Sequence, residues 1–280
     1  MEPRFSFGRN WINYAKNSAD ENAIKTAQES LLRFFSPEQL KGKVFVDAGC
    51  GSGLFSLAAL RLGAAKALSF DLDEKSLEAS RYVRGKFAGE LAAKWDIFQG
   101  DVLDPAFVSS DKARGDIVYS WGVLHHTGNM HLALKNALEL VNPGGLFAVA
   151  LYNRTPATPF WFKAKRFYNY HPLARPFMEL GWGALACAVY MGRRKTLSLR
   201  RERGMNVFYD AIDWIGGYPY EYASVEEVKA YMEKLGAQLD KTVTALPALP
   251  EEGASFLARH RAAHTGCNEF LFRKNRLVPE

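Results

Sequence analysis

Short apolar runs alternate with amphipathic segments along the first half of the chain. Runs with the continuous apolar character of buried strands lie at 44–46, 67–70, 95–99, 116–120 and 146–152. Segments with helical spacing of apolar residues lie between them, at 54–62, 75–88 and 130–141. Continuous apolar strands that alternate with helices predict a parallel sheet with helices on both faces. Right-handed crossovers between such strands predict a doubly wound, Rossmann-like α/β fold.

The two ends of the chain extend this sheet and its helices. Residues 12–35 predict one long helix. Residues 225–235 predict an amphipathic helix, with Ser224 as its N-cap and Glu227 completing a capping box. The last two strands are expected at 238–245 and 269–273. The complete sheet is therefore expected to have seven strands and to be mostly parallel.

One segment departs from the α/β rhythm. Residues 154–222 are rich in aromatic residues and prolines and carry a basic run between Arg193 and Arg203. We expect this segment to form a mostly helical lid, inserted over the carboxyl edge of the sheet. The other expected parts are an N-terminal helical cover at 1–43, the main α/β core at 44–153 and the C-terminal part of that core at 223–280.

Polar residues end four of the predicted strands. Asp47, Asp71, Asp101 and Ser120 each follow an apolar run. The carboxyl ends of parallel strands meet at one edge of the sheet, and ligands of doubly wound folds bind in the crevice outside that edge. We therefore expect these four side chains to face a common ligand.

The first strand runs into a glycine-rich loop, Asp47-Ala48-Gly49-Cys50-Gly51-Ser52-Gly53. Such a loop points backbone N–H groups and a helix N-terminus at a ligand. The G-x-G-x-x-G/A pattern of nicotinamide-dependent enzymes fits poorly, because its sixth position is Leu54 here. A carboxylate at Asp47 would repel a pyrophosphate but would attract an ammonium group. Asp71 is placed to accept the hydroxyls of a ribose. These features favour S-adenosylmethionine (SAM), which has an amino-acid tail, an adenosine and no phosphate.

Five consecutive motifs resemble those of the class I SAM-dependent methyltransferase family: VFVDAGCGSG, SFDLD, QGD at 99–101, DIVYSWGVLHHT and LVNPGGLFAVALYN. The resemblance implies SAM as cofactor. It implies that Asp71 holds the ribose, Asp101 the adenine amino group, Val102 the adenine ring and Gly49 the methionine moiety. The full expected cofactor set is Asp47, Gly49, Cys50, Gly51, Gly53, Asp71, Leu72, Asp101, Val102, Ser120, Trp121 and Trp11. Segments near both ends are similar to a bacterial subgroup described loosely as quinol-type methylases.

Two adjacent histidines, His125 and His126, follow the fourth predicted strand. A histidine at this place suits a general base that takes the proton of an acceptor hydroxyl near neutral pH. Several small-molecule O-methyltransferases have a similar LHH pattern. The fifth strand ends in Tyr152-Asn153, where related enzymes sometimes have an aspartate that orients the base. Either histidine is a candidate base, and the alternative for each is a structural role in the cofactor pocket.

The lid leaves several interpretations open. Its aromatic residues either line a pocket for an aromatic, lipid-like or sugar-derived acceptor, or they form the core of the lid itself. Its basic run suits an anionic membrane surface, RNA or plain solvent exposure. The leading hypothesis is O-methylation of a small molecule. The alternatives are an RNA methyltransferase that uses the basic run, and a catalytically silent SAM-binding protein.

Composition limits the remaining classes. The chain has 280 residues, a net charge of +6 and 48% hydrophobic residues, as expected for a globular protein. The three cysteines, Cys50, Cys187 and Cys267, are far apart, so neither a disulfide framework nor a zinc site is indicated. No metal is expected. The chain shows no signal sequence, and its longest apolar stretch, 177–191, is too short to span a bilayer, so we expect a cytoplasmic location.

Overall fold

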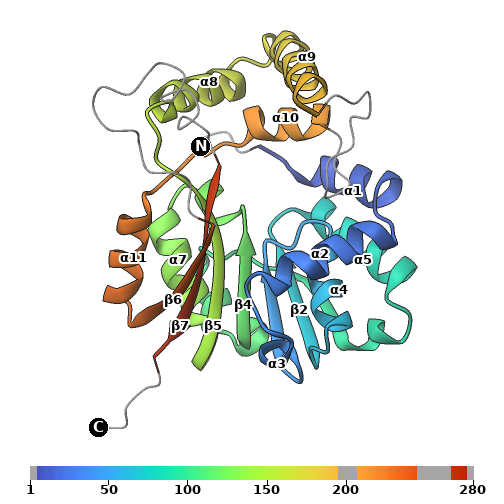
Figure 1. The fold of residues 1–280 in the computed structure, drawn as a ribbon, viewed down its shortest axis with the longest axis vertical. Coiled ribbons are helices and arrows are strands. Elements are labelled where there is room, and N and C mark those ends of the chain that lie inside the picture. The colour runs from blue at the N-terminus through green and yellow to red at the C-terminus, as the bar shows by residue number, and fades with distance from the viewer. Residues whose placement is uncertain (1–4, 195–206, 245–265, 276–280) are drawn as a thin grey trace.

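A computed structural model of the chain describes residues 5–194, 207–244 and 266–275. A single seven-stranded sheet with the order β3-β2-β1-β4-β5-β7-β6 lies at its centre (Figure 1). The strands are β1 (Val44–Ala48), β2 (Lys66–Asp71), β3 (Trp95–Gln99), β4 (Gly115–Trp121), β5 (Val141–Tyr152), β6 (Ala237–Thr244) and β7 (Cys267–Lys274). Strands β1 to β5 are parallel, and β7 runs antiparallel to both β5 and β6. The predicted seven-stranded, mostly parallel, Rossmann-like fold is confirmed.

Helices cover both faces of the sheet, and others lie over the carboxyl ends of its strands. They are α1 (Gly8–Asn17), α2 (Glu21–Leu32), α3 (Pro37–Leu40), α4 (Leu54–Arg61), α5 (Glu74–Phe87), α6 (Pro105–Ser109), α7 (Met130–Glu139), α8 (Thr158–Tyr170), α9 (Arg175–Arg194), α10 (Val207–Gly216) and α11 (Val225–Lys234), with short 3₁₀ turns η1 (Gly89–Lys94), η2 (Asp111–Ala113) and η3 (Leu124–His126). Helices α2, α4 and α5 bury one face of the sheet, and α6, α7 and α11 bury the other (Figure 1). The capping box predicted for α11 is confirmed. Within the described residues, no helix combines the length and apolar character needed to cross a membrane.

The structure corrects two of the predicted helix boundaries. The single helix expected at 12–35 is two helices, because Asp20 has an extended backbone and caps α2 by accepting the Ala23 N–H. The helix expected to reach Val141 ends at Glu139. Val141 already pairs with Gly115, and a register shift in β4 lets the 142–145 segment join β5. Apolar spacing alone missed both breaks, because a side-chain cap and strand pairing set them.

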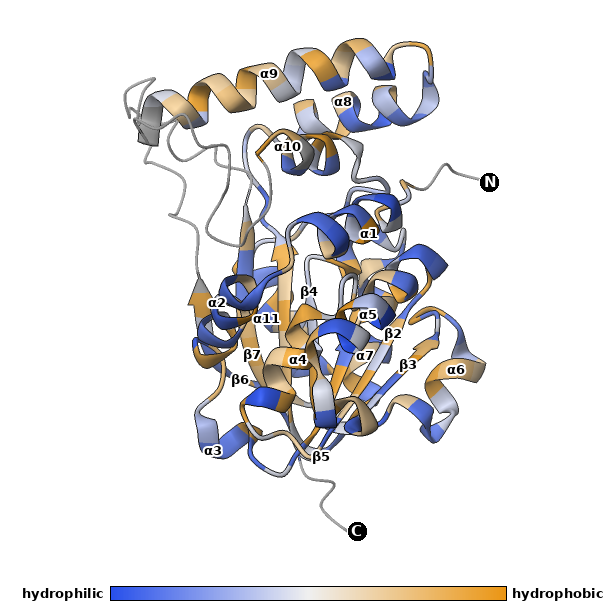
Figure 2. Ribbon diagram, turned by 90° about the vertical axis from the view of Figure 1, so that its right-hand side faces the viewer, coloured by the Kyte–Doolittle hydropathy of each residue, from blue (hydrophilic) through white to orange (hydrophobic). Residues whose placement is uncertain are grey.

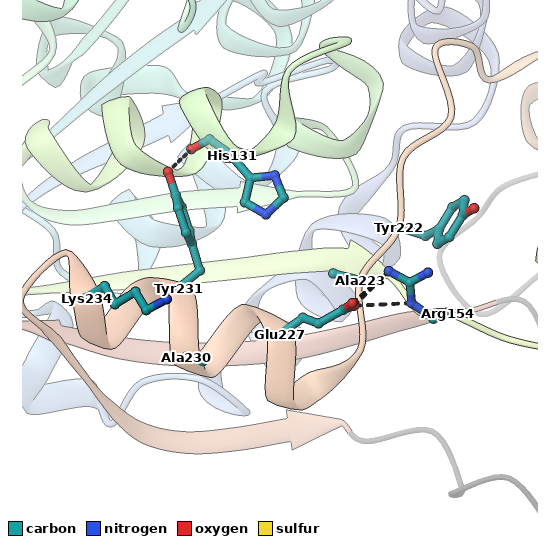
Figure 3. Close-up of a pocket in the computed structure, with 8 residues that line it drawn as sticks. All are labelled: His131, Arg154, Tyr222, Ala223, Glu227, Ala230, Tyr231 and Lys234. Atoms are coloured by element: carbon teal, nitrogen blue, oxygen red, sulfur yellow. Dashed lines mark hydrogen bonds and ion pairs between the residues drawn. The ribbon is translucent and has the colours of Figure 1, made fainter.

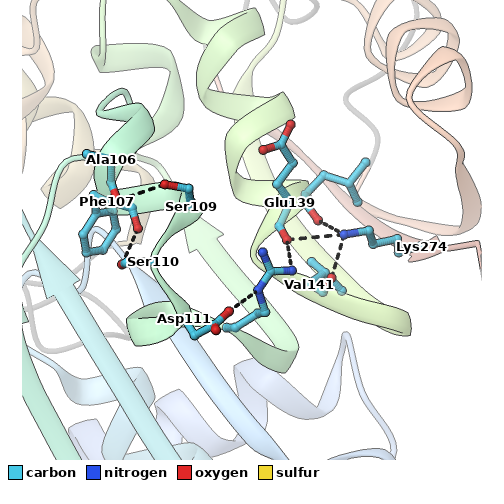
Figure 4. Close-up of polar contacts among 10 residues, drawn as sticks. Ala106, Phe107, Ser109, Ser110, Asp111, Glu139, Val141 and Lys274 are labelled. Carbon is cyan, nitrogen blue, oxygen red and sulfur yellow. Dashed lines mark hydrogen bonds and ion pairs between the residues drawn. The ribbon is translucent and has the colours of Figure 1, made fainter.

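At the amino edge of the sheet, one lysine hydrogen-bonds to three backbone carbonyls (Figure 4). Lys274, at the end of β7, donates to the carbonyls of Leu138, Glu139 and Val141 at 3.0, 3.3 and 2.7 Å. These are carbonyls at and just after the end of α7, where a helix leaves acceptors without partners and favours a cation. The contact ties the last strand to α7 at the edge away from the glycine loop.

Helices α8, α9 and α10 form a roof above the carboxyl ends of the strands (Figure 1). Three tryptophans hold the roof together: Trp161 lies 4.9 Å from Trp182 and 4.2 Å from Trp214 between ring centroids. These aromatic side chains therefore form a core for the roof, which was one of the two interpretations of its composition. Most of the basic run from Arg193 to Arg203 lies outside the described residues, and the boundaries of the expected parts remain a prediction.

A buried carboxylate joins three distant segments near the carboxyl edge. Glu269 of β7 accepts from the Trp121 indole N–H at 2.7 Å and from Arg33 at 2.8 Å. Glu269 is buried, whereas Arg33 remains largely exposed. The network links the end of α2, the central strand β4 and β7, the last strand in the chain.

We expect Glu269→Ala to lower the free energy of unfolding by about 1–3 kcal/mol, because the Trp121 N–H loses this acceptor in a buried setting. Urea unfolding followed by circular dichroism measures the change. Glu233→Ala, which removes an exposed ion pair to Lys229 on α11, is the matched control and should cost less than about 0.5 kcal/mol. Equal stability of the two variants would contradict the structural role of Glu269.

Candidate functional site

The glycine loop is packed so tightly that two of its glycines are required. Gly49 and Gly53 both have positive φ angles, of 77° and 71°. A Cβ atom on Gly49 would lie 2.4 Å from the side chain of Val123, and one on Gly53 would lie 2.6 Å from Trp95. The loop thus lies directly against the segment between β4 and η3, and Gly53 begins α4. Its conformation presents the start of α4 to the carboxyl edge.

Asp71 holds the glycine loop to the end of β2. One carboxylate oxygen accepts from the Gly51 N–H at 3.1 Å, and the other accepts from the Asp73 N–H at 2.9 Å. Burial raises the pKa of Asp71 to about 6, although both hydrogen bonds lower it. A carboxylate offers about four acceptor positions. The Ser76 side chain also hydrogen-bonds to Asp71, so the carboxylate keeps capacity for a further hydroxyl donor.

Asp47 is the first residue of the loop motif and is buried. It accepts from the Ser56 hydroxyl at 2.6 Å, and Ser56 in turn lies 2.6 Å from Ser69. Burial raises the pKa of Asp47 to about 7, and the nearby negative charge of Asp71 adds to the shift. Two desolvated carboxyl groups beside one loop form a site where a cationic ligand would be stabilised.

The residues expected at the adenine end lie together after β3. The Asp101 carboxylate accepts from the Leu103 N–H at 2.8 Å. Val102 is buried, and its carbonyl accepts from Asn136 of α7 at 2.7 Å. Leu72 is largely exposed. Because Gln99 pairs with Asp71 across β2 and β3, the structure brings this group next to the predicted ribose carboxylate.

Three expected cofactor residues turn their polar side-chain atoms into the protein. The Cys50 sulfur lies 3.4 Å from the Ser80 hydroxyl, and the Ser120 hydroxyl donates to the Ala48 carbonyl at 2.9 Å. Trp121 donates its indole N–H to Glu269. These side chains support the shape of the loop and of β4, so direct cofactor contact by them remains a prediction.

The N-terminal segment covers the glycine loop. A Cβ atom on Gly51 would lie 2.9 Å from the ring of Trp11, so the indole rests on the loop. The Gly8 N–H and the Ser6 hydroxyl donate to Asp73, at 3.1 and 2.8 Å. The structure therefore places Trp11 beside the residues expected to bind the cofactor, although it comes from outside the α/β core.

His126 has its proton position fixed by its neighbours. Its Nδ1 lies 2.7 Å from the carbonyl oxygen of Pro219. A carbonyl only accepts, so Nδ1 carries the hydrogen and Nε2 keeps a free lone pair in the neutral ring. Phe7 lies 5.1 Å away between ring centroids. Burial, together with the charge of Lys165, lowers the pKa of His126 to about 3, so the ring is neutral at physiological pH.

His125 has the opposite tautomer. Its Nδ1 lies 3.3 Å from the backbone N–H of Tyr152, which can only donate. The ring hydrogen is therefore on Nε2, and that atom is buried without a hydrogen-bond partner within the described structure. Burial, reinforced by His126 and Lys165, keeps the pKa of His125 well below its ordinary value. Only His126 therefore offers an unprotonated nitrogen whose orientation is fixed by a hydrogen bond at its other nitrogen.

The roof adds ionisable groups that sequence reasoning mostly missed. Lys165 of α8 is fully buried, donates to the Trp214 carbonyl and lies 4.9 Å from the centroid of the Tyr220 ring. Burial lowers the pKa of Lys165 to about 7. Asp213 of α10 accepts from Asn10 at 2.5 Å, and burial raises its pKa to about 7. Nothing in the sequence separates Lys165 from the exposed Lys163 nearby.

A separate pocket of about 260 Å³ lies between α7 and α11 (Figure 3). Its lining includes the ion pair of Arg154 and Glu227, His131 and Tyr231. None of the predicted site residues lines it, so it is distinct from the carboxyl-edge site. In the part of the chain that the structure describes, no group of three His, Cys, Asp or Glu side chains is arranged to hold a metal ion.

Comparisons with known proteins agree with this geometry. A family model described as a methyltransferase domain matches residues 19–207. Ribosomal protein L11 methyltransferase from Shigella sonnei is 48% identical over 50 residues, which is 18% of this chain and 17% of that protein. The chain thus spans about one sixth of the length of the curated relatives it matches, so the match carries no information on the acceptor.

Two solved structures share the fold. A putative SAM-dependent methyltransferase from Listeria monocytogenes has a TM-score of 0.52 and 16% identity, over 90% of this chain and 99% of that one. Magnesium protoporphyrin IX methyltransferase from Synechocystis, solved with bound S-adenosylhomocysteine (SAH), has a TM-score of 0.50 and 11% identity, over 98% and 90%.

We predict that the two buried carboxyl groups make the affinity for SAM dependent on pH. The expected ligand groups, an ammonium at Asp47 and ribose hydroxyls at Asp71, both require the ionised carboxylate. Binding should therefore release protons when the pH is near or below the raised pKa values of about 7 and about 6. Affinity should therefore fall as the pH is lowered from about 8 to about 5.5, by about tenfold per unit for each fully coupled group. Calorimetry in buffers of different ionisation enthalpy measures both the affinity and the protons released.

Asp71→Asn is the control for this dependence, because it removes one of the titrating groups. It should weaken binding at pH 8 and make the remaining pH profile flatter. An affinity that is constant over the range, with no proton release, would show that these carboxyl groups do not bind the cofactor.

Proposed function

Because this chain belongs to the class I, SAM-dependent methyltransferase family, we propose that it transfers a methyl group from SAM to a hydroxyl group of a small molecule. The proposal has three parts: a cofactor site at the glycine loop, His126 as the base, and an acceptor held under the roof.

The residues at the glycine loop fit SAM. In the proposal, Asp71 accepts the ribose hydroxyls, Asp101 and Val102 hold the adenine, and Asp47 with the loop faces the amino-acid end. The raised pKa values of Asp47 and Asp71 support this arrangement, since desolvated carboxylates favour a cationic ligand over a phosphate. The cofactor supplies an activated methyl group on a positively charged sulfur.

The geometry of His126 is the observation that carries the assignment of the base. Two contacts place His126. Val123 contacts Gly49 of the loop, and the backbone N–H of His126 donates to the Val123 carbonyl at 2.8 Å. His126 therefore lies one short turn from the expected methionine end of the cofactor. Its Nε2 lone pair can accept the proton of an acceptor hydroxyl while the oxygen forms its bond to the methyl carbon.

Charge balance favours this step despite the low pKa of His126. Bound SAM would supply a positively charged sulfur whose charge is lost on methyl transfer, and His126 would gain a positive charge with the hydroxyl proton. The number of charges in the buried site stays the same. The Pro219 carbonyl, which already accepts from Nδ1, stabilises the protonated ring. A base held in this way typically contributes about 10²–10⁴-fold to the rate.

The enclosure of this site favours a small acceptor. His126 is only partly accessible, and it is covered by Phe7 and by the Gly217 backbone at the end of α10. The half-buried ring of Tyr152 lies 5.4 Å from the His126 ring between centroids, and the Lys165 ammonium lies 5.6 Å from the centroid of the Tyr152 ring. The carboxyl of Asp213 acts on the same tyrosine. Their mixture of aromatic and polar character suits an aromatic, lipid-like or sugar-derived hydroxyl compound.

The acceptor class is tested with methyl-labelled SAM and a cell extract divided into small-molecule, lipid, RNA and protein fractions. We expect label in the small-molecule or lipid fraction. Label confined to RNA would establish the alternative function, RNA methylation, and label confined to protein would equally overturn a small acceptor. Tight SAM binding with no label in any fraction would indicate a catalytically silent SAM-binding protein.

His126→Ala tests the base. This variant should keep its affinity for SAM within about threefold and lose about 10²–10⁴-fold in turnover, because the hydroxyl proton has no acceptor. Tritium transfer from labelled SAM and calorimetry give the two quantities. His131→Ala, on the outer side of α7, is the matched control and should leave both unchanged. Equal losses of SAM affinity and turnover in His126→Ala would indicate a structural role instead.

A further inference from the structure

The outermost helix of the roof exposes an apolar face to the outside. Helix α9 has 20 residues, so it is about 30 Å long, and it lies at the end of the molecule opposite α3 (Figure 2). Every exposed position between 176 and 192 is apolar or glycine: Pro176, Phe177, Leu180, Gly181, Ala184, Leu185, Ala188, Val189 and Gly192. A helix on the surface of a globular protein normally exposes charged residues on this side.

Two charged residues of α9, Arg175 and Glu179, make their contacts on the inner side of the helix instead. Glu179 accepts from the Tyr168 hydroxyl, and Arg175 donates to the carbonyls of Tyr168 and Asn169. The inner face is closely packed, because a Cβ atom on Gly183 would lie 2.3 Å from the Phe208 ring. The orientation of the helix is thus set by specific contacts, and its apolar outer face is a consequence of the fold.

The exposed apolar side chains are large and gathered in one region. Leu173 is 89% exposed, Phe177 79%, Leu180 66% and Phe160 64%. The other large exposed hydrophobic residues of α8 and α9 are Phe167, Tyr170, Leu185 and Val189. Only Leu32 and Leu72 show comparable exposure elsewhere in the described residues. Contiguous exposure of this kind marks an interaction surface.

Helix α8 adds positive charge to this surface. Its exposed positions are Pro159, Phe160, Lys163, Arg166, Phe167 and Tyr170, so basic and aromatic side chains share one face. Within α8, α9 and the turn between them, the exposed charged side chains that the structure describes are all basic.

We propose that the outer faces of α8 and α9 dock the protein on the surface of an anionic lipid bilayer. Phenylalanine and leucine side chains enter the boundary between head groups and acyl chains, while Lys163 and Arg166 contact the anionic head groups. The charge pattern favours lipid over a second copy of this chain. A symmetric dimer through this face would bring the same basic surface together with itself, whereas an anionic bilayer complements it.

Sedimentation with lipid vesicles tests the proposal on the full chain. Vesicles of phosphatidylcholine alone are compared with vesicles in which about one third of the lipid is phosphatidylglycerol. We expect binding to the anionic vesicles and at least about tenfold weaker binding to the neutral ones, with the difference reduced at high salt. Absence of binding to the anionic vesicles, or equal binding to both kinds, overturns the proposal.

Variants locate the surface. The double variant Phe177→Ser and Leu180→Ser should lose at least about tenfold in binding to anionic vesicles, because the apolar contact is removed. Lys163→Glu with Arg166→Glu should abolish the preference for anionic lipid. Leu32→Ser, on α2, is the matched control for an exposed leucine and should bind like the unmodified chain. Circular dichroism and SAM affinity verify that each variant is folded.

The same variants exclude the competing occupant. Light scattering of the unmodified chain gives its oligomeric state without lipid. A dimer that Phe177→Ser and Leu180→Ser convert to monomers, together with no vesicle binding by the unmodified chain, would assign this face to self-association and overturn lipid docking. A monomer that binds anionic vesicles and loses this property in the double variant supports it.

Discussion

The burial of ionisable groups at the carboxyl edge of the sheet governs the protonation states in the candidate active site. Asp47, Asp71, His126 and Lys165 are each held where burial disfavours the charged form, so the carboxyl pKa values rise and the imidazole and ammonium pKa values fall. Near neutral pH, Asp47, Asp71 and Lys165 are therefore close to their pKa values, whereas His126 is neutral. Such a site responds strongly to the arrival or loss of a single charge, and a sulfonium cofactor brings one.

The histidine pair shows how backbone groups assign chemistry to side chains of the same type. The Pro219 carbonyl and the Tyr152 N–H each contact one Nδ1, but the first accepts and the second donates. The two adjacent rings therefore have opposite tautomers. Pro219 lies after the roof helices and Tyr152 ends β5, so the roof and the sheet jointly decide which histidine can act as a base.

The roof connects two surfaces of different chemistry. On its inner side, Lys165 lies near the Tyr152 ring at the end of β5, and Asp213 accepts from Asn10 of α1. On its outer side, α9 exposes apolar residues and α8 exposes basic and aromatic ones. Because α8 contributes to both, a roof docked on lipid would hold the proposed acceptor site next to the bilayer. This arrangement is compatible with a lipid-like acceptor and would account for the exposure of the hydrophobic surface.

Local patterns in the sequence determined the fold and the cofactor loop. The apolar runs, the alternating glycines and the carboxylates at or near the ends of β1, β2 and β3 act within short segments, so their positions could be predicted with small errors in boundaries. Capping by Asp20 and the early start of β5 escaped prediction, because a side-chain hydrogen bond and strand pairing override apolar spacing. Only the tertiary structure distinguished Lys165 from Lys163, His126 from His125, and the inner face of α9 from its outer face. These differences depend on burial and on partners far away in the chain, such as Trp214 and Pro219, which a linear pattern does not contain.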